Sequence, residues 1–304
     1  MTDQPTPSGS AAAPPTGPII TLPPPPEFLV AAGELGIEFE PDDVPRLGRY
    51  LQMLLEANRT TNLTGITDPA EAWRKHILDA LALVPLIASF AADRQNRDRE
   101  AADPTSGDIE TPSDAGEPSD LTTPGPLPHG RGSDGRGSTP LSLIDIGSGG
   151  GVPAIPLAIV LPDLRVTLVE ATGKKVDFLR RVIADLKLKN TRVIQGRAET
   201  LGQDHRLHRE HYDLATARAL GHLNIVIELL GPLIRPHGLL LAIKGAKADQ
   251  ELGESKKALG LIGLKHLQTV DTPTGRVVTL DKTTRTPRLY PRRDGEPARA
   301  PLKG

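Results

Sequence analysis

The sequence predicts an α/β protein with a doubly wound sheet of seven mostly parallel strands, preceded by a small helical part. Three observations support this prediction. Residues 141–146 form a short apolar run that breaks into a glycine-rich turn, and an apolar helical segment follows the turn. Strand-like and helix-like segments then alternate regularly. Residues 260–270 and 275–282 finally predict a hairpin, which would place one antiparallel strand in an otherwise parallel sheet.

The composition limits the class of protein. The 304 residues include 30 Pro and 30 Gly, so we expect one folded domain with extensions that do not fold. The chain contains no Cys, which excludes disulfides, zinc–thiolate sites and thiolate nucleophiles. No apolar stretch is expected to span a bilayer, and the first residues lack the pattern of a signal peptide. We therefore expect a cytoplasmic protein without membrane contact, and we assign no metal ligands.

The chain before the glycine-rich turn divides into three parts. Residues 1–26 are rich in Pro, Thr, Ser and Ala, which predicts a disordered leader. Apolar residues recur at helical spacing over residues 27–92, which predicts two helices, a polar loop and a third helix. Asp68-Pro69 would open the third helix, which would end at about residue 91. Residues 93–140 contain ten Asp and Glu against five Arg, which predicts a disordered acidic insert. The insert carries −5, so the rest of the chain is mildly basic at +3.

Two polar side chains are expected to share one face of the third helix. His76 and Asp79 stand three residues apart, close to where the loop around Asn62 must return. A lone histidine in an amphipathic helix is usually structural, so spacing alone does not assign His76 to a functional site.

The sheet domain is expected to span residues 141–284, and a basic tail, residues 285–304, follows it. The predicted strands are residues 141–146, 165–170, 192–195, 212–216, 238–244, 260–270 and 275–282, and the predicted helices between them are residues 154–161, 174–188 and 223–234. From residue 282 to the end, seven Lys and Arg stand against two acids. Such a tail suits RNA phosphates.

The glycine-rich turn indicates a nucleotide-like ligand, because glycines allow positive φ and let a ligand lie against the main chain. Two classes of cofactor use such a turn. From Gly149 onward it matches the dinucleotide pattern G-x-G-x-x-A. From Asp145 onward it has the form of the first motif of S-adenosylmethionine (SAM) methyltransferases, and the terminal hairpin is the mark of that variant of the Rossmann-like fold. Glu170, at a strand end, would bind ribose hydroxyls in either class.

Several segments together resemble one known family. They are residues 62–64, 74–80, 145–157, 173–179, 197–199, 216–219, 241–245 and 290–298. With them the chain resembles the glucose-inhibited division protein B family, ribosomal RNA small-subunit methyltransferase G, over about residues 28–92 and 141–301. The resemblance implies a monomeric SAM-dependent enzyme that makes 7-methylguanosine in bacterial 16S rRNA, with naked RNA or the small ribosomal subunit as partner. The leader, the acidic insert and Gly150, where proline or alanine is common, depart from the family pattern.

The resemblance also implies which residues form the site. The cofactor-binding residues would be Gly147, Gly149, Gly151, Val152, Glu170, Ala171, Thr172, Ala198, Glu199 and Arg218. The glycines would face the methionine part of SAM and Glu170 the ribose, and the adenine would be lined by Ala171, Thr172, Ala198 and Glu199. Catalytic candidates at the guanine would be Arg218, His76, Asn62 and Lys244, and RNA-binding candidates would be Arg276, Arg292 and Arg293.

The target atom is narrowed by what the chain lacks. Without cysteine, methylation of a pyrimidine carbon through a thiolate adduct is impossible. Residues 215–219 read Ala-Thr-Ala-Arg-Ala in place of the Asn/Asp-Pro-Pro-aromatic motif common in methylation of exocyclic amines. Guanine N7 fits, because it carries no proton and needs no general base. Two alternatives stay open: a nicotinamide-dependent oxidoreductase, and a catalytically silent RNA-binding assembly factor on the same fold.

Overall fold

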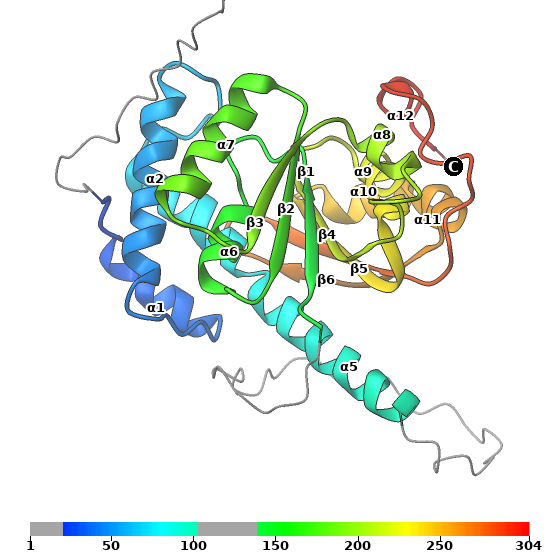
Figure 1. Ribbon diagram of the computed structural model, residues 1–304, viewed down its shortest axis with the longest axis horizontal. Coiled ribbons are helices and arrows are strands. Elements are labelled where there is room, and N and C mark those ends of the chain that lie inside the picture. The colour runs from blue at the N-terminus through cyan, green and yellow to red at the C-terminus, as the bar shows by residue number, and fades with distance from the viewer. Residues whose placement is uncertain (1–20, 103–138, 304) are drawn as a thin grey trace, which may run out of the picture.

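A seven-stranded sheet forms the centre of the protein (Figure 1), in the order β3-β2-β1-β4-β5-β7-β6. The strands are β1 (Ser142–Ile146), β2 (Arg165–Glu170), β3 (Thr191–Gln195), β4 (Tyr212–Arg218), β5 (Ile234–Lys244), β6 (Leu264–Asp271) and β7 (Arg276–Lys282). β7 pairs antiparallel with both β5 and β6, and the other pairs are parallel. The predicted doubly wound sheet with a terminal antiparallel hairpin is therefore confirmed. The computed structural model describes residues 21–102 and 139–303, so most of the predicted leader and acidic insert lies outside the described residues.

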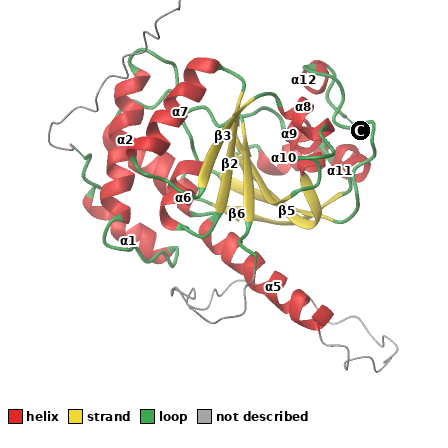
Figure 2. Cartoon of the chain, in the orientation of Figure 1, coloured by secondary structure: helices red, strands yellow, loops and turns green. Residues whose placement is uncertain are grey.

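Helices cover both faces of the sheet (Figure 2). Successive residues of a strand point to opposite faces, and apolar side chains on both faces must be covered. In β1, Leu143 joins one core and Ile144 the other. The first core is closed by α1 (Pro26–Glu34), α2 (Asp43–Asn58), α6 (Ala154–Val160) and α7 (Gly173–Asp185). The second is closed by α8 (Ala198–Gln203), α9 (Leu223–Leu230), α10 (Ala248–Glu254) and α11 (Lys256–Ile262). The predicted N-terminal helices therefore form one layer of a single domain.

The predicted third helix is a longer helical run. It consists of α3 (Pro69–Ala72), the π-helix η1 (Trp73–Leu78), α4 (Asp79–Leu81) and α5 (Val84–Ala102). It begins as predicted, because the Asp68 side chain caps it by accepting the Glu71 N–H at 2.7 Å. The predicted end at about residue 91 was wrong. Arg94 pairs with Asp213 at 3.1 Å, and the helix continues past this anchor and projects from the body (Figure 1).

That helical run is also long and apolar enough to cross a membrane. No segment of this kind was expected from the sequence. The segment Pro69–Ala101 has an apolar window of mean hydropathy 1.5, and 61% of this window is buried inside the protein. The apolar residues of the run therefore form part of the core.

The C-terminal third departs from the prediction in two places. The predicted strand 260–270 begins only at Leu264, because α11 occupies the chain up to Ile262 and ends at Gly263, whose φ of 79° terminates it. The predicted basic tail is folded: residues 285–303, here called the C-terminal strap, pack against α8 and α9 and include the short helix α12 (Glu296–Arg299).

Candidate active site

The glycine-rich turn joins β1 to α6 at the carboxyl edge of the sheet. Gly147, Gly149 and Gly151 have φ values of 70°, 54° and 96°, which side chains with a Cβ rarely adopt. The N–H groups of Gly147 and Ser148 donate to the Val169 carbonyl at 2.9 and 3.1 Å. The turn is therefore tied to the neighbouring strand β2, while Gly147 stays exposed and Gly149 half-buried.

Gly150 has a steric reason to be glycine. A Cβ at this position would lie 2.6 Å from a methyl carbon of Leu54 on α2, a fully buried side chain. The Gly150 carbonyl also accepts a hydrogen bond from the Tyr50 hydroxyl at 2.8 Å. The departure from the family pattern is thus explained by the close approach of α2 to the turn.

Glu170 ends β2 beside the turn and is 7% exposed. Its carboxylate accepts the Gly149 N–H at 3.0 Å and the Thr172 N–H at 2.8 Å. Each carboxylate oxygen keeps a second lone pair, so Glu170 is held in place and can still accept a ligand hydroxyl. Ala171 and Thr172 follow it at the surface, and Val152 is half-buried at the start of α6.

Asp145 lies in β1, just before the turn. It is 1% exposed and is surrounded in the strand by buried apolar residues. Neither side-chain oxygen has a hydrogen-bond partner among the described residues. Burial and, to a smaller extent, the nearby charge of Glu170 together raise the pKa of this carboxyl to about 7, although the Ser148 hydroxyl acts to lower it. An unpartnered buried carboxyl at a ligand turn calls for a cationic group to complete it.

A second polar group stands at the end of β4. Nη1 of Arg218 lies 3.2 Å from Nδ1 of His76, and Nε2 of His76 lies 2.8 Å from the Thr64 hydroxyl. Arginine can only donate, so Nδ1 of His76 accepts, and its Nε2 carries the proton and donates to Thr64. Burial and, to a smaller extent, the charge of Arg218 together lower the pKa of His76 to about 4, so the imidazole is neutral.

Arg218 keeps donors in reserve. Among the described residues its side chain makes one hydrogen bond, to His76, out of the five N–H groups of a guanidinium. The side chain is half-buried, and burial lowers its pKa while Asp79 and Tyr50 raise it. Arg218 therefore presents free N–H groups beside the glycine turn.

The structure confirms that His76 meets the polar loop, although through Thr64. Asn62 itself is exposed, and no contact holds its side chain among the described residues. Asn58 shapes the loop instead, because its side chain accepts the Leu63 and Thr64 N–H groups, each at 2.9 Å. Asn62 thus remains a candidate only as a surface contact near the site.

Asp79 is used to join the N-terminal layer to the terminal hairpin. It is 2% exposed and accepts the Thr274 N–H at 3.0 Å and the Thr274 hydroxyl. The π-turn of η1 adds a residue to the helical repeat, so His76 turns toward Arg218 while Asp79 turns toward the hairpin.

Two other candidate cations are engaged in ion pairs. Nζ of Lys244 lies 2.6 Å from both Glu251 and the Gly221 carbonyl, so Lys244 fixes the loop that follows β4. Arg276 bonds Asp271 at 2.8 Å and also Asp249, at the hairpin. Both residues are therefore better placed to position the site than to hold a ligand.

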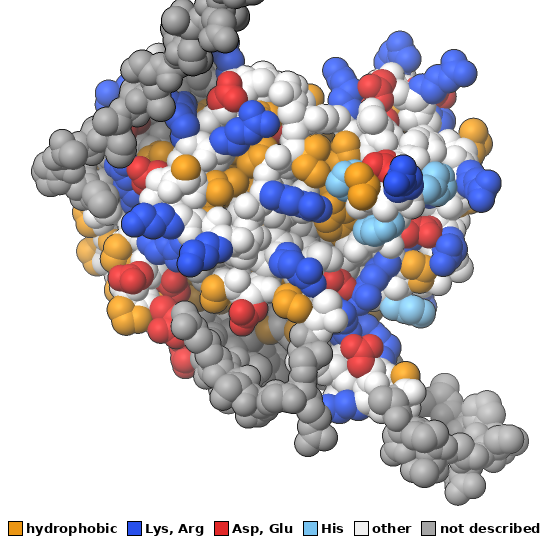
Figure 3. All heavy atoms as spheres, in the orientation of Figure 1, with side chains coloured by type: hydrophobic (Ala, Val, Ile, Leu, Met, Phe, Trp, Pro, Cys, Tyr) orange, Lys and Arg blue, Asp and Glu red, His pale blue; other side chains and the backbone are white. Residues whose placement is uncertain are grey.

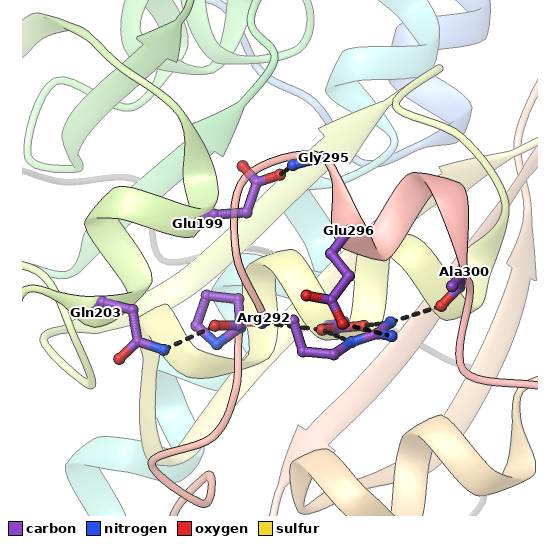
Figure 4. Close-up of polar contacts among 8 residues, drawn as sticks. Glu199, Gln203, Arg292, Gly295, Glu296 and Ala300 are labelled. Atoms are coloured by element: carbon purple, nitrogen blue, oxygen red, sulfur yellow. Dashed lines mark hydrogen bonds and ion pairs between the residues drawn. The ribbon is translucent and has the colours of Figure 1, made fainter.

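The C-terminal strap reaches the predicted adenine side of the site (Figure 4). Glu199, on α8, is 8% exposed and accepts the Gly295 N–H at 2.9 Å, while Ala198 is buried beside it. Gln203, one turn later on α8, donates to the Pro291 carbonyl at 2.7 Å. The strap therefore holds the helix that carries Ala198 and Glu199.

The expectation that Arg292 is a free RNA contact needs correction. Its guanidinium forms a forked ion pair with Glu228, at 2.6 and 2.8 Å, and the Glu228 side chain is 0% exposed. It also donates to the Ala300 carbonyl at 2.7 Å (Figure 4). Because the buried carboxylate needs this partner, Arg292 holds the strap together. Arg293 is exposed and remains a candidate for RNA contact.

Comparison with known proteins places this site in a family. A family model described as rRNA small subunit methyltransferase G matches residues 43–98 and 134–278. Ribosomal RNA small subunit methyltransferase G of Sorangium cellulosum is 38% identical over 272 residues, 90% of this chain and 93% of that protein. The protein of the same name from Leuconostoc citreum is 33% identical over 280 residues, 90% of this chain and 98% of that protein. The chain belongs to this family.

The protein is therefore a SAM-dependent methyltransferase, and the nicotinamide and catalytically silent alternatives are not favoured. The residues present fit the cofactor. The unpartnered Asp145 carboxyl suits the ammonium of the methionine part, and Gly147 in the turn is exposed. Glu170 keeps acceptor capacity for ribose hydroxyls.

Sequence reasoning missed three contributors to the site. Asp145 was used only as the first residue of the glycine motif and was given no role, although an acid inside an apolar strand itself indicates a functional position. Thr64 was part of the quoted loop but had no role. Tyr50 occupies an apolar helix position, and nothing local indicates that its hydroxyl reaches the glycine turn 100 residues away.

Proposed function

We propose that this methyltransferase transfers the methyl group of SAM to N7 of a guanine in 16S ribosomal RNA of the small subunit. The relatives' names support the RNA substrate. The observation that supports the choice of N7 is that His76, the histidine beside Arg218, is not available as a general base. His76 is neutral. Its Nδ1 accepts a hydrogen bond from Arg218, and its Nε2 already carries a proton.

The acceptor chemistry agrees with this arrangement. Guanine N7 has an in-plane lone pair and no proton to remove, so positioning and exclusion of water suffice. SAM supplies the methyl group on a cationic sulfonium. On the same edge of the base, guanine O6 is a second acceptor. The free N–H groups of Arg218 would hold O6 and leave the N7 lone pair for attack.

The cofactor would lie along the carboxyl edge. Gly147, Gly149 and Gly151 would face the methionine part, and Asp145 would pair with its ammonium. Glu170 would accept from the ribose. Ala171, Thr172, Ala198 and Glu199 would line the adenine; Glu199 keeps one carboxylate oxygen for that role, because the Gly295 N–H uses the other.

We also propose that the protein works as a cytoplasmic monomer without membrane contact. The burial of 61% of the apolar window of its one membrane-length helix among the described residues supports the absence of membrane contact. Gel filtration with light scattering and cell fractionation would test it. A stable dimer or membrane-bound fraction would refute it.

The function is tested with tritium-labelled SAM and small ribosomal subunits from a strain that lacks the gene. We expect incorporation into 16S rRNA and 7-methylguanosine after digestion to nucleosides. The matched substrate is subunits from the wild-type strain, which should accept no label because the guanine is already methylated. Label in another nucleoside, or in neither substrate, would refute the proposal.

A further inference from the structure

A cavity of about 510 Å³ opens at the amino edge of the sheet. Its wall includes the first residues of four neighbouring strands: Ser142, Arg165, Thr191 and Tyr212. The candidate active site lies at the opposite edge. The six residues of β2 rise about 3.3 Å each, so the two edges are about 17 Å apart. The cavity is therefore separate from the site described above.

Cations dominate the wall of this cavity. Its charged side chains are Arg94, Arg165, Lys189, Arg192, Arg235 and, as the one carboxylate among the described lining residues, Asp213. The Asp213 carboxylate is 7% exposed and pairs with Arg94 at 3.1 Å and Arg235 at 2.5 Å. Exposed Asp98 adds a weaker contact to Arg94 at 3.7 Å. Lys and Arg side chains also gather near the base of the projecting α5 (Figure 3).

The other three cations meet only neutral groups among the described residues. Nη2 of Arg165 donates to the Pro140 carbonyl at 3.1 Å. Arg192 donates to the hydroxyls of Thr167 at 3.0 Å and Tyr212 at 3.3 Å. Lys189 is exposed, and no hydrogen bond engages its ammonium within the described chain. These contacts orient the cations without compensating their charge.

One further donor is unsatisfied. Nε of Arg235 is buried and has no hydrogen-bond partner among the described residues, while its Nη2 is paired with Asp213. A buried donor without a partner costs free energy that a bound acceptor would recover. Together with the three uncompensated cations, it makes the cavity a receptor for an anion with several oxygens.

We propose that this cavity is a second RNA-binding site, which takes up backbone phosphates of the substrate RNA on the edge of the sheet opposite the methyl-transfer site. The proposal rests on the proposed function. Phosphates are the recurrent anion of RNA, and contacts to them set the register and orientation of the nucleic acid on the protein. Two contacts about 17 Å apart would fix the direction of the RNA strand as well as its position on the protein.

Neutralising two of the uncompensated cations tests the proposal. In Lys189→Gln with Arg165→Gln, the lost contacts are one carbonyl hydrogen bond and the two charges, so the fold should be retained and its melting temperature unchanged. The control is Lys256→Gln with Lys257→Gln, which removes the same net charge from exposed positions on α11. Affinity for 16S rRNA is measured at several salt concentrations, together with SAM affinity and the kcat and KM of methyl transfer.

We expect the cavity variant to bind RNA about tenfold more weakly, with a salt slope shallower by about 0.7 for each lost phosphate contact. KM for RNA should rise, while kcat and SAM affinity stay unchanged. Equal affinity and slope in the cavity and control variants would overturn the proposal. So would strong binding of free AMP or pyrophosphate that the cavity variant loses while RNA binding is unaffected. If the wild type transfers no methyl group, the proposed function fails, and RNA affinity still decides the role of the cavity.

Discussion

Asp145 makes the glycine turn sensitive to protons. Its pKa is raised from 3.8 to about 7, so the folded protein binds a proton that the unfolded chain releases between these values. The stability that Asp145 contributes without cofactor is therefore present in full below about pH 4 and is lost as pH rises to about 7, by of order 4 kcal/mol at 1.36 kcal/mol per unit. An ammonium beside the carboxylate would reverse that loss.

We expect Asp145→Asn to remove this pH dependence. The apo variant should melt higher than the wild type at pH 8 and alike at pH 4. Its SAM affinity should be low and flat, whereas wild-type affinity should strengthen as pH rises through 7. Thermal unfolding and titration calorimetry measure both, with exposed Asp163→Asn as the control. Wild-type behaviour in Asp145→Asn would mean that Asp145 stays charged or lies away from the cofactor.

His76 should position the site without exchanging protons. Because its pKa is about 4, it stays neutral above about pH 5, and the stability that this neutral form contributes is lost only as pH falls from 6.5 through 4. Single-turnover rates at saturating SAM should be flat from pH 6 to 8. His76→Ala should slow transfer by up to about 100-fold through misplacement of Arg218, with the profile still flat. A wild-type rate that falls tenfold per unit below pH 6.5, and loses that dependence in His76→Ala, would show that His76 is a base.

At the scale of elements, the C-terminal strap is the part whose role changed most. The sequence predicted a basic tail that suits RNA phosphates, but Arg209, which is 5% exposed, binds the strap carbonyls of Thr286 and Tyr290, each at 2.7 Å. Arg292 adds its ion pair with Glu228. These contacts cross more than 60 residues of sequence, so no local pattern reports them.

We expect Arg292→Ala to destabilise the protein by about 3–5 kcal/mol, because Glu228 would be left as a buried charge without its partner. Arg293→Ala should change stability by less than about 0.5 kcal/mol. Urea unfolding measures both. Adding Glu228→Gln to Arg292→Ala should recover part of the loss. Equal stability of Arg292→Ala and Arg293→Ala would show that the ion pair contributes nothing.

At the scale of the whole molecule, the features that could be predicted from the sequence were those that depend on residues close together in the chain. Strand period, the glycine turn and the capped start at Asp68 each lie within a few residues of sequence, and all were found. The Arg218–His76 contact joins residues 142 apart, and the cavity combines cations from α5 and from several strand ends. Such assemblies depend on how the layers pack. For the same reason the continuation of α5 past residue 91, where the Arg94–Asp213 pair anchors it, was not predicted.

The two edges of the sheet divide the work in this account. The carboxyl edge carries the glycine turn, the unpartnered Asp145 and the Arg218–His76 contact, and the amino edge carries the basic cavity. Binding of RNA and transfer of the methyl group should therefore be separable by substitution. Variants at the amino edge should change RNA affinity alone, and variants at the carboxyl edge should change SAM affinity or the rate of transfer.

The central claim is that the acceptor atom is guanine N7. The most direct measurement uses 16S rRNA transcribed with 7-deazaguanosine, which has a C–H group in place of N7 and keeps O6. The two RNAs are assembled into subunits in parallel. The account predicts that the 7-deazaguanosine RNA binds with nearly the affinity of the unmodified transcript but accepts no methyl group from SAM, while the unmodified transcript is labelled. Equal labelling of the two RNAs would contradict the account, because the methyl group would then be on another atom.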